Sequence, residues 1–385
     1  MRRVYLDYNA TTPVAPEVLE AMLPYLREDF GNPSSLHGVG ARARKALEDA
    51  RETIARCLSC SDREIVFTRG GTESVNLALQ GVVAALLRTN GEKRPHVVTS
   101  AVEHQAVLQT IESLEKEGRV EVTRLQVDAS GDLDLREIEA SLRETTVLIS
   151  IMFVNNETGN IYPITAIGNL ARARGIPFHT DAVQAVGKLP VDLKRLPVDL
   201  LSFSSHKIYG PKGVGALYIR KGVRLRPILF GGAQEMEKRG GTENLAGVVG
   251  FGAAMERIHH DMEKESARVA SLRDRLQAGL IESVPGTRIH GKERHRIGNT
   301  LMVTFEGVTS ETILLALDRQ GIAVSAGSAC ASGALEPSHV LMAMGVASKE
   351  AKGAVRFSLG RQTTEDDINK VLDVMPAMVA GCRST

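Results

Sequence analysis

The chain has 385 residues, of which 43% are hydrophobic and 24% charged, and its formal net charge is +1. This balance argues against a polyanion as partner, and the longest apolar runs are too short to span a membrane. The length predicts one large and one smaller domain. Four cysteines without the spacing of a disulfide framework, and an N-terminus without an apolar leader, predict a cytoplasmic protein.

In chain order, a loop at 5–15 precedes a helix at 16–29, and a second helix runs to about residue 57 with Ser34 or Ser35 as its expected N-cap. Strands and helices then alternate. The predicted strands are 64–67, 96–99, 120–127, 146–153, 176–179, 199–203 and 215–219; the predicted helices are 75–87, 105–117, 133–142 (capped by Asp132) and 164–173. This alternation predicts an α/β fold with a mostly parallel sheet and helices on both faces.

Beyond residue 220 the pattern changes. Residues 224–241 are rich in glycine and are predicted to be irregular, and 242–284 reads as a long helix that links the two domains. Strands at 299–305 and 355–359 then mix with helices at 311–320 and 364–379. This mixture is typical of a small α+β domain.

Polar residues follow the predicted strands, at the edge where parallel sheets bind ligands. The turn at 70–74 opens a helix, and backbone N–H groups at a helix N-terminus suit a phosphate. The later strands run into 103–104, 155–157, Asp181 with Gln184, and 204–207. The last of these segments ends at Lys207. This residue is interpreted either as a solvated loop lysine or as a lysine that loses its charge by forming a Schiff base with a carbonyl cofactor.

Pyridoxal phosphate accounts for this whole set. It requires a lysine for its aldehyde and a carboxylate that keeps its ring nitrogen protonated. It also requires a donor to its ring hydroxyl, a flat group against its face and a phosphate site. The candidate lysine is Lys207 and the candidate carboxylate is Asp181. Asn156 or Gln184 would donate to the ring hydroxyl, and His104 is the flat group. The candidate phosphate site consists of Gly71, Thr72, Ser204 and His206. A dinucleotide would explain the glycines but not the lysine and aspartate, and metal sites explain neither.

The C-terminal part holds two further candidates. Cys330 lies in a run of small residues, 322–339, that predicts a loop able to bring a thiol into a cleft; a buried small cysteine is the alternative. Arg356 could grip a substrate carboxylate or form a structural ion pair. Cys57 and Cys60 form a CxxC at a helix end and are interpreted as structural cysteines.

Several motifs, in order along nearly the whole chain, resemble those of the cysteine desulfurases of the NifS/IscS type, which belong to the class V aminotransferase group of fold type I pyridoxal phosphate enzymes. They are 5–12, 31–35, Gly71-Thr72-Glu73-Ser74, 155–159, His179-Thr180-Asp181-Ala182-Val183-Gln184, Ser205-His206-Lys207, 241–244, and the run 327–339. The resemblance implies a large cofactor-binding domain, 16–255, with a seven-stranded sheet. It implies a small α+β domain made of 1–15 and 256–385.

The resemblance also implies L-cysteine as substrate, L-alanine as product and a persulfide on Cys330, passed to an iron–sulfur scaffold or another sulfur acceptor. Lys207 would form the Schiff base with the cofactor, and His104 would stack on its ring and exchange protons. Thr242 would complete the phosphate site across a homodimer interface. Asn32 and Arg356 would hold the substrate carboxylate.

Two alternatives stay open. One is another pyridoxal phosphate lyase or aminotransferase of the same fold, such as a selenocysteine lyase. The other is a non-catalytic sulfur or metal carrier that uses Cys57, Cys60 and Cys330. Aminotransfer would leave Cys330 idle, so a variant at this residue discriminates between desulfuration and transamination.

Overall fold

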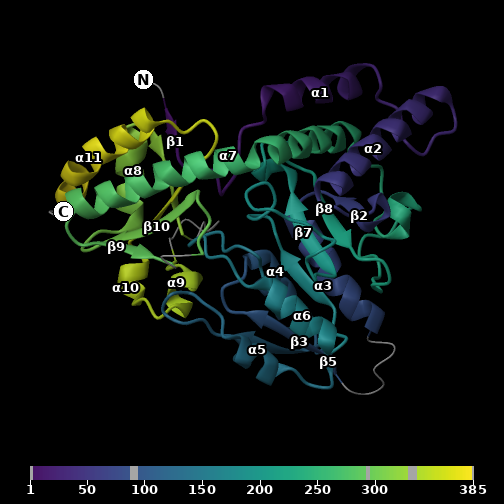
Figure 1. Ribbon diagram of the computed structural model, residues 1–385, viewed down its shortest axis with the longest axis horizontal. Helices are drawn as coiled ribbons and strands as arrows, with labels where there is room; N and C mark the ends of the chain where they lie inside the picture. Colours follow the sequence, from purple (N-terminus) through teal and green to yellow (C-terminus); the bar gives the residue numbers. More distant parts are fainter. Residues whose placement is uncertain (1–2, 87–93, 292–294, 328–335, 384–385) are drawn as a thin grey trace.

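The computed structural model describes residues 3–86, 94–291, 295–327 and 336–383. One long helix, α7 (Leu245–Ser283), runs across the two bodies of the molecule (Figure 1). Its first part contributes Phe251 to the core of one body, and its second part contributes Leu276 to the core of the other. The predicted linking helix is therefore confirmed. The predicted domain boundary after residue 255 falls inside this unbroken helix and stays a prediction.

The first body is built on a seven-stranded sheet of order β2-β8-β7-β6-β5-β3-β4. Its strands are β2 (Ile65–Thr68), β3 (His96–Ser100), β4 (Glu121–Leu125), β5 (Thr146–Ser150), β6 (Phe178–Asp181), β7 (Leu200–Ser204) and β8 (Gly215–Ile219). Only β8 runs against its neighbours β7 and β2, and the other pairings are parallel. The prediction of a mostly parallel sheet is confirmed.

The short link between β7 and β8 explains the one reversed strand, because a parallel crossover needs a dozen or more residues. The link holds only the short 3₁₀ helix η2 (Ser205–Lys207) and a turn. Since β8 is antiparallel to both of its neighbours, β2 and β7 run in the same direction. The carboxyl ends of β2, β3, β5, β6 and β7 therefore lie at one edge of the sheet.

Helices cover both faces of this sheet. Neighbouring strand residues enter different cores, as Leu148 and Ile149 do in β5, because side chains alternate along a strand. α3 (Gly71–Leu86) and α4 (Gln105–Lys116) bury their apolar side chains in one core, while α2 (Gly38–Cys57), α6 (Ile164–Ala173) and the start of α7 bury theirs in the other. The remaining helices of this body are α1 (Pro16–Arg27), η1 (Asp62–Glu64), α5 (Leu135–Ser141) and η3 (Gln234–Glu237).

Two predicted helix caps are wrong. The cap of α2 is His37, whose Nδ1 accepts the N–H of Gly40 at 3.2 Å, because Ser34 and Ser35 are engaged in a turn on Asn32. The cap of α5 is Asp134, since the side chain of Asp132 accepts the N–H of Leu133 instead.

The second body has a separate antiparallel sheet of order β12-β13-β10-β9. Its strands are β9 (Thr287–His290), β10 (Thr300–Phe305), β12 (Ser325–Ala326) and β13 (Ala354–Ser358), accompanied by α8 (Ser310–Arg319), α9 (His339–Ala343), α10 (Ser348–Ala351) and α11 (Glu365–Arg383). The N-terminal strand β1 (Val4–Tyr5) pairs with β11 (Ile322–Ala323), so the start of the chain lies in this body (Figure 1).

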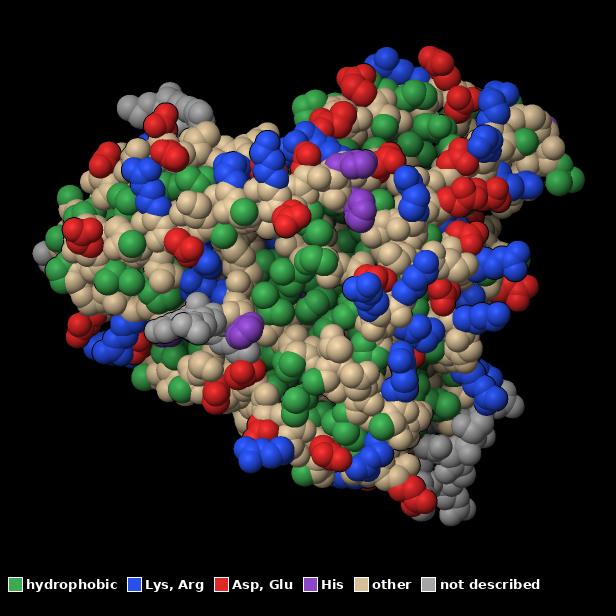
Figure 2. Space-filling view, in the orientation of Figure 1, with side chains coloured by type: hydrophobic (Ala, Val, Ile, Leu, Met, Phe, Trp, Pro, Cys, Tyr) green, Lys and Arg blue, Asp and Glu red, His purple; other side chains and the backbone are tan. Residues whose placement is uncertain are grey.

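Basic and acidic side chains are interspersed over the face shown in Figure 2, in keeping with the small net charge. In the described part of the chain, no helix is both long enough and apolar enough to cross a membrane.

Candidate active site

A cavity of about 690 Å³ lies at the edge where the parallel strands end. Most of the predicted site residues line it: Gly71, Thr72, His104, Asn156, Asp181, Gln184, Ser204, His206, Lys207 and Arg356. The first nine lie at or beyond the carboxyl ends of strands of the large sheet, and Arg356 comes from β13 of the second body. Asn32 and Thr242 do not line this cavity within one chain. Cys330 lies outside the described residues.

Lys207 ends η2, directly after β7. Its Nζ donates to the backbone oxygens of Asn9, at 2.5 Å, and Ala10, at 2.8 Å. Burial, assisted by the positive charge of Arg356, lowers the pKa of Lys207 to about 8. A lysine with a lowered pKa holds more of the neutral amine that attacks a carbonyl carbon. Lys207 therefore differs from an ordinary solvated loop lysine.

Asp181 ends β6 and is 7% exposed. One of its oxygens accepts the N–H of Val183 at 2.9 Å. Burial raises the pKa of Asp181, because an ionised carboxylate is unfavourable in a buried site without a positive partner. A protonated ring nitrogen is such a partner, so the position suits the predicted cofactor.

The predicted phosphate end contains a buried hydroxyl with no partner. Among the described residues, nothing hydrogen bonds to Ser204 Oγ, although the residue is 3% exposed. Gly71 is the first residue of α3, where N–H groups lack partners within the helix. A Cβ on Gly71 would lie 2.8 Å from Val183 Cγ2 and 3.8 Å from Ser204 Cβ, so glycine leaves room for a ligand. These features fit a phosphate group.

Three histidines line the cavity, and two of them, His104 and His206, are predicted site residues. His104 is the N-cap of α4: its Nδ1 accepts the N–H of Ala106 at 3.1 Å, so in the neutral ring the proton lies on Nε2. Its ring is exposed and offers a flat surface to the cavity. Burial and the charge of Lys207 lower the pKa of His206 to about 4. His206 is thus neutral near pH 7.

Arg356 is held by two hydrogen bonds. Its guanidinium donates to Asp7 Oδ1 at 2.9 Å and to the backbone oxygen of Asn156 at 3.1 Å. The Arg356–Asp7 contact is the structural ion pair that the sequence left open. The Nε of Arg356 has no partner within the described part of the chain, and Arg356 lines the cavity. A fixed guanidinium with unused N–H groups can accept a carboxylate.

Sequence reasoning gave no role to Asn9 or Glu157, although both lie in motifs that it singled out. Glu157 is 2% exposed, and burial raises its pKa to about 7. It accepts a hydrogen bond from Ser338 Oγ, and its Oε1 lies 3.9 Å from His339 Nδ1. The contact joins the loop after β5 to the start of α9 in the second body. No local spacing could reveal a pairing between residues so far apart.

Burial raises the pKa of Cys57, and it raises that of Cys60 to about 12. A thiol must ionise to bind metal or attack sulfur, so these surroundings disfavour both roles. The interpretation of the pair as structural agrees with this environment.

Residues 4–371 match the family described as aminotransferase class-V. Over 383 residues the chain is 49% identical to a protein named cysteine desulfurase IscS from Dictyoglomus turgidum, covering 100% of this chain and 96% of that one. The chain belongs to the cysteine desulfurases, within the class-V aminotransferase family.

Other cysteine desulfurase relatives agree. A protein named cysteine desulfurase IscS from Methanosarcina thermophila is also 49% identical, with coverage of 100% of this chain and 93% of that one. A solved NifS-like protein superposes with a TM-score of 0.92 at 38% identity, covering 99% of this chain and 100% of that one. The resemblance and the fold predicted from the sequence are confirmed.

Proposed function

We propose that the chain is a pyridoxal phosphate-dependent cysteine desulfurase that converts L-cysteine to L-alanine and leaves a persulfide on Cys330. The observation that carries the proposal is the arrangement of Lys207, Asp181 and the phosphate-type site of Ser204 and Gly71 around one cavity. The named relatives favour this function over a selenocysteine lyase or an aminotransferase.

When bound, the cofactor supplies an aldehyde and a protonated ring that draws electrons from the substrate Cα. Lys207 would hold the cofactor through its aldehyde, and the Lys207 amine or His104 would move the proton of the substrate Cα. Asp181 keeps the ring nitrogen protonated. Gln184 and Asn156 line the cavity and would contact the ring hydroxyl. Gly71, Thr72, Ser204 and His206 would hold the phosphate.

Arg356, assisted by Asn32, holds the substrate carboxylate. The Cys330 thiolate then attacks the substrate sulfur: a sulfur–sulfur bond forms as the carbon–sulfur bond breaks, and its electron pair stays on the carbon, which a proton converts to alanine. The thiolate is the reactive form, so His104 or a nearby cation assists its deprotonation. The persulfide is a reversible state of the thiol from which sulfur can pass to an acceptor.

We also propose a homodimer, in which the partner subunit's Thr242 completes the phosphate site. Neither Thr242 nor Asn32 lines the cavity of its own chain. Large apolar side chains, among them Leu36 at 95% and Phe230 at 82%, are exposed in the body that carries the cavity. A second copy would cover such side chains. The acceptor is an iron–sulfur scaffold or another sulfur-accepting protein of the cytoplasm.

Absorbance and product analysis test the function. Protein loaded with pyridoxal phosphate should be yellow, and Lys207→Ala should abolish the lysine-linked absorbance. L-cysteine should then yield alanine without any 2-oxo acid in the assay. Production of alanine only with a 2-oxo acid acceptor would identify an aminotransferase instead.

A further inference from the structure

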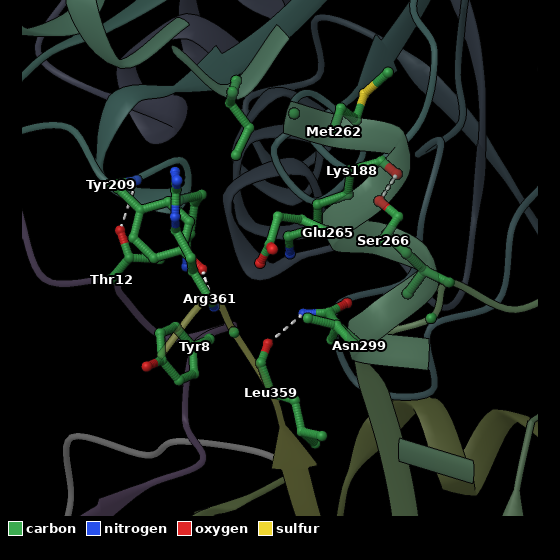
Figure 3. A pocket seen from close by; sticks show the side chains of 17 residues that line it. Tyr8, Thr12, Lys188, Tyr209, Met262, Glu265, Ser266, Asn299, Leu359 and Arg361 are labelled. Atoms are coloured by element: carbon green, nitrogen blue, oxygen red, sulfur yellow. Dashed lines mark hydrogen bonds between the residues drawn. The ribbon is translucent and has the colours of Figure 1, made fainter. Parts of the chain in front are cut away.

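Lys188 is a lysine for which the proposed reaction has no use, and its amine points into the protein. It lines a second cavity, of about 60 Å³, beside the one described above (Figure 3). Among described residues, the two cavities share Lys207 alone. Figure 3 shows Lys188 next to α7, where its backbone oxygen accepts a hydrogen bond from Ser266 Oγ at 3.0 Å.

The amine of Lys188 contacts two residues of the cofactor cavity. It donates to Gln184 Oε1 at 2.6 Å and to Asn9 Oδ1 at 3.3 Å. Gln184 is 5% exposed and Asn9 is 3% exposed, so the amine ends among buried polar groups. Lys188 thus reaches from the second cavity to the wall of the first.

This contact determines which way the Gln184 amide faces. A protonated lysine has only donors, so the atom of Gln184 nearest to it must be the carbonyl oxygen. The amide nitrogen then lies on the other side, where it donates to the backbone oxygen of Asn9 at 3.0 Å. A flipped amide would place two oxygens together at Asn9 and two nitrogens together at Lys188. Because an amide nitrogen carries two hydrogens, one N–H remains for the cavity that Gln184 lines.

The same network includes the cofactor lysine. The backbone oxygen of Asn9 accepts from both Gln184 and Lys207, and the Asn9 side chain accepts from Asn299 at 2.9 Å. Asn9 is therefore fixed from three sides, and the orientation of the Gln184 amide is set by the Lys188 amine on one side and the Asn9 backbone oxygen on the other.

We propose that Lys188 is a positioning residue: it holds the Gln184 amide so that an N–H group, not the carbonyl oxygen, faces the ring oxygen of bound pyridoxal phosphate. The inference rests on the proposed function. Burial, with the charges of Lys207 and Arg356 nearby, lowers the pKa of Lys188 to about 7. A neutral amine still donates N–H, so the contact with Gln184 persists in either protonation state.

A double-mutant cycle tests this role, with the pH midpoint of the absorbance change of the bound cofactor as the measured quantity. A donated N–H favours the deprotonated ring oxygen and lowers the proton affinity of the bound cofactor. Lys188→Met should therefore raise the pH midpoint of the absorbance change, by about one unit, which is a factor of about 10 in proton affinity. Gln184→Met should raise it similarly. Because Lys188 acts through Gln184, the double variant should shift no further than Gln184→Met alone.

The charge of Lys188 provides the competing explanation, since its loss would raise the midpoint without involving Gln184. In that case the two shifts would add, and the positioning role would be wrong. Lys194→Met, at an exposed site nearby in sequence, is the control and should leave the midpoint unchanged. If Lys188→Met does not fold, Lys188→Gln takes its place in the cycle. A wild-type protein that never becomes yellow would overturn the proposed function and this inference together; a yellow protein with additive shifts would overturn the inference alone.

Discussion

Glu103, beside the cavity residue His104, is a fully buried carboxyl. Its Oε1 accepts hydrogen bonds from Ser100 Oγ at 2.6 Å and from the N–H of Met152 at 3.0 Å. Its Oε2 has no partner among the residues that the structure describes. Burial raises the pKa of Glu103 to about 8 from the ordinary 4.5. Between pH 4.5 and pH 8, the Glu103 carboxyl keeps its proton in the folded protein but loses it in the unfolded chain. The contribution of Glu103 to the free energy of unfolding therefore falls as pH rises across this range.

Glu103→Gln removes this titration while keeping the shape of the protonated carboxyl. The variant should match wild type near pH 4.5 and be more stable than wild type at pH 8, by about 1.4 kcal/mol for each pH unit by which the folded pKa exceeds the ordinary one. Urea unfolding of cofactor-free protein at both pH values measures the difference. Glu20→Gln, at an exposed site, is the control. An equal difference at both pH values would contradict the assignment.

Lys207 should react with the cofactor in its neutral form. The rate at which cofactor-free protein gains the lysine-linked absorbance should therefore rise with pH and level off above about 8. Arg356→Met removes a neighbouring cation that lowers the pKa of Lys207, so the midpoint of this rise should move to higher pH. Stopped-flow absorbance across pH gives both midpoints. A midpoint that stays in place would show that Arg356 does not influence the amine.

At the scale of elements, a buried ion pair joins α2, β2 and η3. Arg51 donates to both carboxylate oxygens of Glu235 at 2.8 Å, and Glu235 also accepts the N–H of Phe67 at 2.7 Å. The two side chains are 11% and 1% exposed.

Glu235→Gln leaves the Arg51 charge buried and unpaired, so it should lower the free energy of unfolding by about 3–5 kcal/mol. Lys45→Ala breaks an exposed pair with Asp49 on the same helix and should change it by no more than about 0.5 kcal/mol. Urea unfolding compares the two variants. Losses of similar size would mean that the buried pair contributes no more than the exposed one.

At the scale of the whole molecule, the gathering of the candidate residues around one cavity was largely predictable, because alternating strands and helices place the strand ends at one edge. Asp181, Ser204 and Lys207 meet there for that reason. The reversed direction of β8, the caps of α2 and α5, and the partners of Glu157 were not predictable. They depend on contacts between segments distant in sequence or on local turns that compete for the same side chain. The role proposed for Lys188 likewise emerges only from its contacts in the fold.

The most direct test of the account is the mass of the peptide that contains Cys330 after one turnover with L-cysteine. We predict that this peptide gains one sulfur atom, that alanine forms in equal amount, and that neither occurs with Lys207→Ala. Cys330→Ser should form no persulfide and should lose alanine production. Alanine formation at the wild-type rate by Cys330→Ser, with the wild-type peptide unmodified, would contradict the account.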